Sequence, residues 1–239
     1  MAKSRCLIII PAFNEQDSIS NVVENIIQSY PDYDYVVVND GSVDHTGKIC
    51  RANGNNLLDL PINLGLAGAF HTGLKYAYEN DYEYCLQYDA DGQHQAKYID
   101  SMIEQMDKGY DIVIGSRFLD RKIRFTPQNI GNKFISLAMR IVCHKKITDS
   151  TSGMRMWNRK MMRLFVHDLN CTPEPDTVAY LIKNGAKVCE VPVKMKARLA
   201  GRSYLTAWKS VYYMLRVTAS IFIIQWFRPK LDMEEGLPK

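Results

Sequence analysis

The chain contains 239 residues, of which 46% are hydrophobic and 23% are charged. This balance supports a large buried core in one domain with appendages, and it excludes a chain that is disordered throughout. The six cysteines are scattered, without a CxxC pair or a histidine at zinc spacing, which argues against a disulfide framework or a zinc knuckle. The first residues lack the layout of a signal peptide, because their apolar run of four residues ends at Pro11. We therefore expect a cytoplasmic protein.

Charge is distributed unevenly between the two halves of the chain. Residues 1–120 carry 8 Lys and Arg against 18 Asp and Glu, a net charge of −10. Residues 121–239 carry 22 against 8, a net charge of +14. The basic half predicts an anionic partner, either nucleic acid or an anionic membrane surface.

Apolar runs of strand length alternate with helical periodicity along the first half of the chain. Strands are predicted at residues 6–11, 33–40, 55–61, 82–92 and 110–118. Helices are predicted between them, at residues 18–30, 46–54, 66–80 and 96–109. This alternation predicts an α/β fold with a mostly parallel central sheet.

Polar residues follow the carboxyl ends of four of these predicted strands. They are Asn14 and Glu15, Asp40 and Ser42, Asp89 and Asp91, and Ser116 and Arg117. Ligands of α/β sheets bind beyond these strand ends, so we expect a site there. The first strand is followed by PAFNE and not by GxGxxG, and a Walker A loop is absent, so an ordinary dinucleotide or P-loop site is not predicted.

The stretch DADGQH, residues 89–94, places two carboxylates two residues apart at the end of the fourth predicted strand. Residues at this spacing in an extended chain point to the same side of the sheet. Oxygen ligands in such an arrangement suit Mg²⁺ or Mn²⁺. A solvated turn uses the same residue types, but the convergence of polar groups at the strand ends favours the metal.

Six motifs occur in order along the chain: PAFNE, VNDGSVDHT, NLGLAGAFHTGLKYA, YDADGQH, GSRF and DSTSGMRMWNR. Together they resemble family 2 glycosyltransferases of the GT-A fold, and most of all the dolichol-phosphate mannose synthase type with its bacterial polyprenyl-phosphate relatives. The resemblance covers about residues 5 to 205. It implies a Rossmann-like catalytic domain at residues 1–204. Residues 205–239 are predicted from their own amphipathic pattern to form an interfacial helix and a polar tail.

The resemblance also implies roles for individual residues. Those matching the nucleotide-sugar contacts are Pro11, Phe13, Glu15, Asp40, Ser42, Asp89 and Ala90. The ligands of Mg²⁺ or Mn²⁺ would be Asp89, Asp91 and Gln93, and the groups near the transferring and acceptor phosphates would be Arg117, Lys133, Ser136 and Arg202. The synthase type usually has an arginine and a serine in the region of Lys133 and Ser136, so this part of the match is loose. Asp91 and Arg117 are the catalytic candidates, because a metal and an arginine stabilise charge on phosphates.

The nature of the acceptor decides whether a general base is needed. A sugar hydroxyl requires a base, whereas a lipid phosphate is already ionised. Asp176 is the candidate base, and either Glu174 or Asp176 could orient the acceptor. The alternative is structural: Asp176 with Thr177 would cap the following helix, and Glu174 would be a charge near its first turn.

Two basic stretches and two amphipathic stretches mark the second half. Residues 121–163 carry eleven Lys and Arg against Asp149 alone, and residues 187–216 carry seven against Glu190 alone. They form either a solvated basic face or an electropositive rim for a lipid phosphate and anionic head groups. Residues 132–143 and 204–227 are amphipathic but too short in their apolar part to span a membrane, so they either lie in the membrane interface or pack on the protein's own core.

These features predict a metal-dependent, inverting hexosyltransferase at the cytoplasmic face of the cell membrane, acting in cell wall polysaccharide biosynthesis. The donor would be a UDP- or GDP-hexose and the acceptor a polyprenyl phosphate, with a small integral membrane protein or a second copy as a further partner. One rival is transfer to a hydroxyl of a lipid-linked sugar, and another is a non-catalytic membrane-associated scaffold. A nucleic-acid binder is not supported, because the basic half lacks a recognition motif.

Overall fold

The computed structural model describes residues 4–120, 127–168, 174–196, 207–228 and 230–231. Its strands are β1 (Cys6–Ala12), β2 (Asp34–Asn39), β3 (Leu57–Asp59), β4 (Tyr84–Gln87), β5 (Ile112–Ser116), β6 (Arg155–Asn158) and β7 (Val188–Pro192). Its helices are α1 (Ile19–Ser29), α2 (Thr46–Ala52), α3 (Gly65–Glu79), α4 (Ile99–Asp107), α5 (Pro127–Cys143), α6 (Arg159–Arg163), α7 (Pro175–Lys183) and α8 (Ala207–Phe227). A 3-10 turn, η1 (Ala96–Tyr98), precedes α4, and a π-helical turn, η2 (Leu164–Asp168), follows α6.

In the part of the chain that the structure describes, seven strands form one sheet in the order β3-β2-β1-β4-β6-β5-β7. Neighbouring strands run parallel except around β6, which is antiparallel to both β4 and β5. The predicted α/β fold with a mostly parallel sheet is confirmed. The five strands expected in the first half are β1 to β5, whereas β6 and β7 were not predicted.

Strand β1 shows why the sheet must be covered on both faces. Leu7 and Ile9 point into a core shared with Phe70 of α3, whereas Ile8 points to the opposite face and packs with Ile19 of α1. A run of consecutive apolar residues is typical of such a strand, because neither face meets water. Helices α3, α5, α6 and α7 contribute to the first core, and α1, α2 and α4 contribute to the second.

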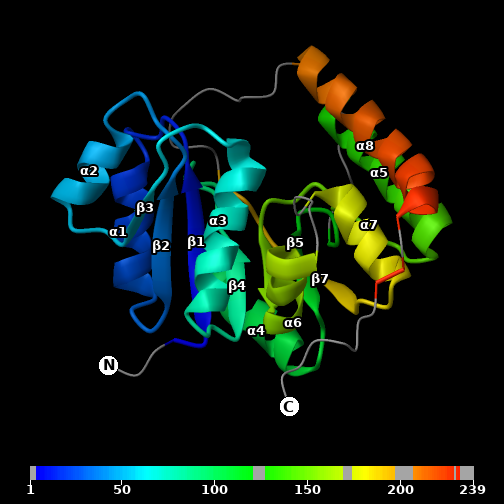
Figure 1. Ribbon diagram of the computed structural model, residues 1–239, viewed down its shortest axis with the longest axis horizontal. Coiled ribbons are helices and arrows are strands. Elements are labelled where there is room, and N and C mark those ends of the chain that lie inside the picture. Colours follow the sequence, from blue (N-terminus) through cyan, green and yellow to red (C-terminus); the bar gives the residue numbers. More distant parts are fainter. Residues whose placement is uncertain (1–3, 121–126, 169–173, 197–206, 229, 232–239) are drawn as a thin grey trace.

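Helices α5 and α8 lie side by side at one end of the molecule, beside α7 (Figure 1). Val217 and Ile221 of α8 are fully buried and join the core, as do Ile135 and Met139 of α5. The other sides of both helices face outward. Within the described residues, no helix is both long enough and apolar enough to cross a membrane.

Candidate active site

The antiparallel direction of β6 brings the segment that precedes it to the edge where the parallel strands end. Arg155, the first residue of β6, pairs in register with Gln87 near the end of β4 and with Ile114 of β5. The residues just before Arg155 therefore lie near Asp89, which follows β4, and near Arg117, which follows β5. Three chain segments thus meet at one edge of the sheet.

The loops after β1 and β2 are locked to each other by backbone and side-chain hydrogen bonds. The hydroxyl of Ser42 accepts from the backbone N–H of Asn14 at 3.0 Å, and Oδ1 of Asn14 accepts from the N–H of Val43 at 3.0 Å. Asn14 has a left-handed φ of 56°, which Asn tolerates better than most residues. These bonds place the predicted Ser42 beside the PAFNE loop.

The loop after β2 is also fixed to the segment between β3 and α3. Oδ1 of the buried Asp40 accepts from the backbone N–H of Leu64 at 2.7 Å. Gly41 has a φ of 62°, and a β-carbon there would lie 2.5 Å from the carbonyl carbon of Ile62. The close backbone approach therefore requires glycine at position 41.

The predicted nucleotide contacts differ in how far they face outward. Pro11 and Ala90 are buried, and the Glu15 carboxylate turns back to accept from the hydroxyl of Ser18 at 2.6 Å. Phe13 is 39% exposed on the same loop as Glu15, so its ring is available to a base or sugar. The structure therefore brings the loops after β1 and β2 together, and Phe13 is the predicted nucleotide contact whose ring faces solvent.

The DADGQH segment closes on itself through His94. Nδ1 of His94 accepts from the backbone N–H of Asp89 at 2.9 Å, so the ring proton is assigned to Nε2, which lies 3.6 Å from Oδ2 of Asp89. The hydroxyl of Tyr88 donates to the carbonyl of His94 at 2.7 Å, and the two rings meet edge to face. Oδ1 of Asp91 accepts from the backbone N–H of Gln93 at 3.0 Å. The loop thus has a defined shape that holds both carboxylates.

The donor set of this loop suits a hard cation. Among the described residues, no group of three His, Cys, Asp or Glu side chains is arranged to hold a metal ion. The carboxylates of Asp89 and Asp91 and the amide of Gln93, all within one short segment, are the types of oxygen ligand that Mg²⁺ or Mn²⁺ completes with substrate phosphates and water. The predicted ligands therefore fit the predicted ion.

Arg117 is held by an acid that the sequence analysis assigned no role. Its Nε donates to Oδ2 of Asp149 at 2.6 Å, its Nη2 donates to Oδ1 at 2.7 Å, and its backbone N–H donates to Oδ2 at 2.9 Å. Asp149 therefore occupies the forked edge of the guanidinium.

A second arginine, Arg155, is buried in the same region and was also missed. Only 5% of its surface is exposed, and it donates to the carbonyls of Ser152 at 2.8 Å and Ser150 at 2.6 Å. Burial lowers its pKa, and the nearby carboxylates of Asp149 and Asp89 act in the opposite sense. Acids and arginines therefore compensate one another's charge at this edge.

Asp176 and Glu174 face α8. Asp176 accepts from the hydroxyl of Ser220 at 2.7 Å and lies 3.7 Å from Nη2 of Arg228, whereas Glu174 accepts from Arg216 at 3.0 Å. Burial raises the pKa of Glu174, with the charge of Asp176 adding to the effect and that of Arg216 opposing it. The structural alternative, in which Asp176 caps α7 and Glu174 lies near its first turn, is wrong about both positions. Glu174 is the N-cap residue of α7, without a side-chain capping bond, and Asp176 lies in the first turn.

The remaining acceptor candidates lie on or beyond α5. The hydroxyl of Ser136 donates to the carbonyl of Thr148 at 3.4 Å, which places it beside the segment that carries Asp149. Lys133 is exposed on the same helix. Arg202 lies outside the described residues.

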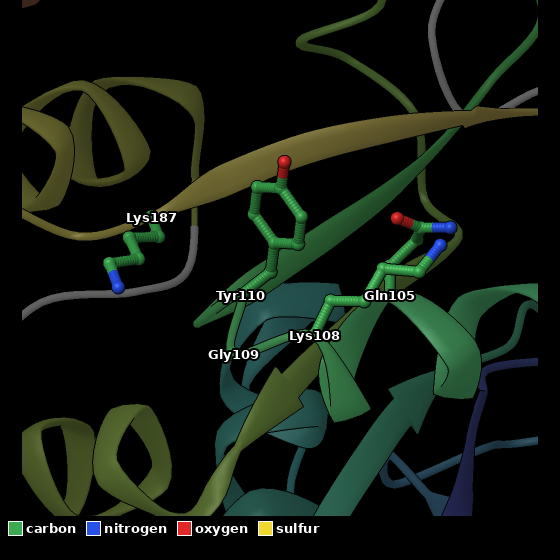
Figure 2. Close-up of a pocket in the computed structure, with 5 residues that line it drawn as sticks. All are labelled: Gln105, Lys108, Gly109, Tyr110 and Lys187. Carbon is green, nitrogen blue, oxygen red and sulfur yellow. The ribbon is translucent and has the colours of Figure 1, made fainter.

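A small surface pocket lies at the opposite end of β5. It is lined by Gln105, Lys108, Gly109, Tyr110 and Lys187, as Figure 2 shows. These residues precede β5 and β7 or end α4, whereas Arg117 follows β5, about 20 Å away along the strand. The pocket is therefore separate from the DADGQH segment, residues 89–94, which we call the acidic loop. It does not form part of the candidate active site.

Gly153 provides a test of the acidic loop. A β-carbon at this position would lie 2.5 Å from Oδ2 of Asp89, the movable end of a side chain. We predict that Gly153→Ala folds normally but displaces the Asp89 carboxylate and weakens Mn²⁺ binding about tenfold or more, since outer contacts of metal ligands have effects of this size. Mn²⁺ titration followed by electron paramagnetic resonance, with a melting temperature for each variant, measures this. Unchanged Mn²⁺ affinity would contradict the assignment of Asp89.

Comparison with known proteins agrees with this geometry. The chain is 32% identical over 218 residues to the UDP-N-acetylglucosamine–dolichyl-phosphate N-acetylglucosaminyltransferase of Methanococcus voltae, covering 81% of this chain and 86% of the relative. It is 26% identical over 249 residues to the polyprenol monophosphomannose synthase of Mycolicibacterium smegmatis, covering 98% and 91%.

The fold is shared with a solved glycosyltransferase structure. Glucosyl-3-phosphoglycerate synthase from Mycobacterium tuberculosis, in complex with Mn²⁺ and UDP-glucose, superposes with a TM-score of 0.66 at 15% identity, covering 95% of this chain and 80% of that one. This confirms the predicted GT-A architecture. The model of the Glycosyl transferase family 2 domain matches residues 7–165, which is more than half of the chain. The chain therefore belongs to glycosyl transferase family 2.

Proposed function

We propose that this protein transfers a hexose from a UDP- or GDP-sugar to a polyprenyl phosphate, with inversion at the sugar, at the inner face of the cell membrane. The observation that carries the proposal is the placement of Arg117 at the same sheet edge as the Asp89–Asp91 loop. Transfer between two phosphate-bearing substrates requires a metal site for the diphosphate of the donor and a positively charged side chain for the phosphate of the acceptor. The Asp89–Asp91 loop would supply the first, and Arg117 would supply the second. The named activities of the two relatives, each with a polyprenyl or dolichyl acceptor, support the choice of acceptor.

Each part of the edge has a separate task in this proposal. Phe13 contacts the nucleotide, while Asp40 and Ser42 hold the loops around it. Asp89, Asp91 and Gln93 would hold a divalent cation, Mg²⁺ or Mn²⁺, which would supply Lewis-acid stabilisation of the leaving diphosphate. Arg117 contacts the acceptor phosphate and keeps that phosphate close to the sugar.

A lipid phosphate acceptor also fits the surroundings of Asp176. The phosphate is an ionised nucleophile, so no side chain has to remove a proton from it. Asp176 is engaged by Ser220 and lies near Arg228, which suits a role in holding α8. The rival acceptor, a hydroxyl of a lipid-linked sugar, requires a base. The observation that favours it is the placement of Asp176 close to a second acid, Glu174, whose pKa is raised by burial and by the charge of Asp176.

The outward side of the α5–α8 pair is the proposed membrane contact. On α5 it exposes Phe134, Leu137 and Ile141, and on α8 it exposes Tyr212, Leu215, Phe222, Ile223 and Phe227. Large apolar side chains gathered on two adjacent helices are typical of an interfacial surface. The exposed cations Lys133 and Arg140 lie on α5 as well, which favours anionic head groups. A second copy of the chain or a small membrane protein would compete for the same surface.

Substitutions of two carboxylates test the metal site and the need for a base. Asp91→Asn should lower transfer of labelled hexose to polyprenyl phosphate about 1,000-fold, because the leaving diphosphate loses its charge stabilisation. Asp176→Asn should leave transfer largely unchanged, because the acceptor needs no base. Both variants are assayed as label entering the organic phase, with donor and metal at saturation.

The two variants separate the competing accounts. Substantial activity in Asp91→Asn would contradict the metal assignment. Loss of activity in Asp176→Asn, with an unchanged melting temperature, would favour the hydroxyl acceptor and a catalytic role for Asp176. Metal-independent binding of nucleotide sugar without any turnover would instead support the scaffold.

Charge substitutions on the apolar surface of α5 and α8 test the proposed membrane contact. The double variant Leu137→Glu, Leu215→Glu should weaken binding to vesicles containing anionic lipid about 100-fold, since each leucine contributes about 1.5 kcal/mol when its surface leaves water. Ile27→Glu is the matched control, because Ile27 is exposed on α1, away from this helix pair. Sedimentation with vesicles measures both. Equal sedimentation of the two variants would contradict the membrane contact, and a change in oligomeric state instead would point to a second copy.

A further inference from the structure

We propose that Asp149 is a positioning residue for this transfer: it fixes Arg117 so that Nη1, and not the forked edge of the guanidinium, meets the acceptor phosphate. The inference rests on the proposed function and adds a specific residue and a specific nitrogen to it. Asp149 touches neither substrate in this account. Its effect passes through Arg117.

The contacts of the guanidinium leave little freedom. Three hydrogen bonds join Arg117 to the Asp149 carboxylate, and Nη2 also donates to the hydroxyl of Thr151 at 3.2 Å. An arginine side chain has five N–H donors, and these bonds use Nε and both positions on Nη2. Within the described part of the chain, Nη1 has no hydrogen-bond partner. Its two N–H groups are the part of the side chain left for a ligand.

Exposure differs sharply across the pair. The Asp149 side chain is completely buried, whereas 35% of the Arg117 side chain is exposed. Asp149 is therefore the fixed partner of the pair, and the Arg117 guanidinium is the partner that is partly open to solvent. Burial acts to lower the pKa of Arg117, but the hydrogen bonds and charge of Asp149, with a further contribution from the charge of Asp89, raise it.

The anchor is itself braced from β7. The Glu190 carboxylate accepts from the backbone N–H of Thr148 at 2.8 Å, from the hydroxyl of Thr148 at 2.9 Å and from the backbone N–H of Asp149 at 2.8 Å. A carboxylate that accepts several N–H and O–H bonds holds a loop more rigidly than apolar packing does. Glu190 therefore determines where the Asp149 backbone lies.

Helix α5 and strand β5 brace the same segment. Nδ2 of the buried Asn132 donates to the carbonyl of Thr148 at 2.8 Å, and the hydroxyls of Ser116 and Thr148 lie 2.7 Å apart. Three elements, β5, β7 and α5, thus hold the segment formed by Thr148 and Asp149 in place, and the Asp149 side chain in turn binds Arg117. Preorganisation of this kind removes the cost of ordering a long side chain when the acceptor arrives.

The test is a double-mutant cycle in the full chain. Asp149→Asn, Arg117→Ala and the double variant are compared with wild type, with hexose transfer to polyprenyl phosphate measured at varied acceptor and at varied donor. Asp111→Asn is the matched control: Asp111 is also buried, it precedes the same strand at the opposite end, and it accepts from Asn158 and from the Lys187 backbone. Melting temperatures are recorded throughout.

The expected result is specific to the acceptor. Asp149→Asn should lower kcat/KM for polyprenyl phosphate about 100-fold, a loss of the size that misplacing a reacting group produces, and should leave the KM for the donor nearly unchanged. In the Arg117→Ala background the same change should have almost no further effect. Asp111→Asn should lower the melting temperature without this kinetic change. If Asp149→Asn does not fold, Glu190→Gln takes its place and should show a smaller loss of the same kind.

Three outcomes overturn the inference. One is an Asp149→Asn variant whose kinetics match those of Asp111→Asn, and another is an effect of Asp149→Asn that is undiminished in the Arg117→Ala background. The third is a loss that falls on donor KM, which would move Arg117 to the donor side. Absence of transfer by wild type is a different result, because it overturns the proposed function before any variant is compared.

Discussion

The antiparallel strand β6, inserted between β4 and β5, is the constraint on which the site depends. A parallel strand in that place would carry its preceding loop to the far edge of the sheet, with the pocket near Tyr110. Because β6 runs the other way, the segment from Thr148 to Gly153 arrives beside the ends of β4 and β5. Asp149 then meets Arg117, and Gly153 lies against Asp89.

This convergence creates an electrostatic problem that the fold solves with arginine. Asp89, Asp91 and Asp149 are brought together in a partly buried region, where unpaired carboxylates are costly. Arg155 lies buried among them and Arg117 pairs directly with Asp149, so the region holds both signs of charge in fixed positions. Charges held in fixed positions are the basis of electrostatic preorganisation, on which the proposed binding of a cation and two phosphates depends.

The features that could be predicted from the sequence are those formed by residues that are contiguous in the chain. Strands β1 to β5 have apolar runs bounded by turn residues, and the DADGQH loop is a contiguous motif, so both were predicted. Strand β6 was not, because Arg155 to Asn158 is short and its direction depends on partners far away in the sequence. The pairing of Asp149 with Arg117 spans 32 residues and follows from that direction.

The missed acids nevertheless left a signal in the sequence. Asp149 and Glu190 are each the single acid of a long basic stretch, and the structure shows the two joined through Thr148. An isolated carboxylate among cations indicates a specific partner more strongly than one in a mixed surface. The acids of α7 show the opposite case: Glu174 and Asp176 were singled out from sequence, but only the packing of α8 shows what they contact.

The most direct test of the account is a transfer assay with wild-type protein. A panel of labelled UDP- and GDP-hexoses is mixed with polyprenyl phosphate and, separately, with a polyprenyl-diphosphate sugar, with and without Mn²⁺ or Mg²⁺. The account predicts an acid-labile, organic-soluble product that forms from the phosphate acceptor and requires the metal. Product from the lipid-linked sugar alone would contradict it and would move the site's chemistry to a hydroxyl nucleophile.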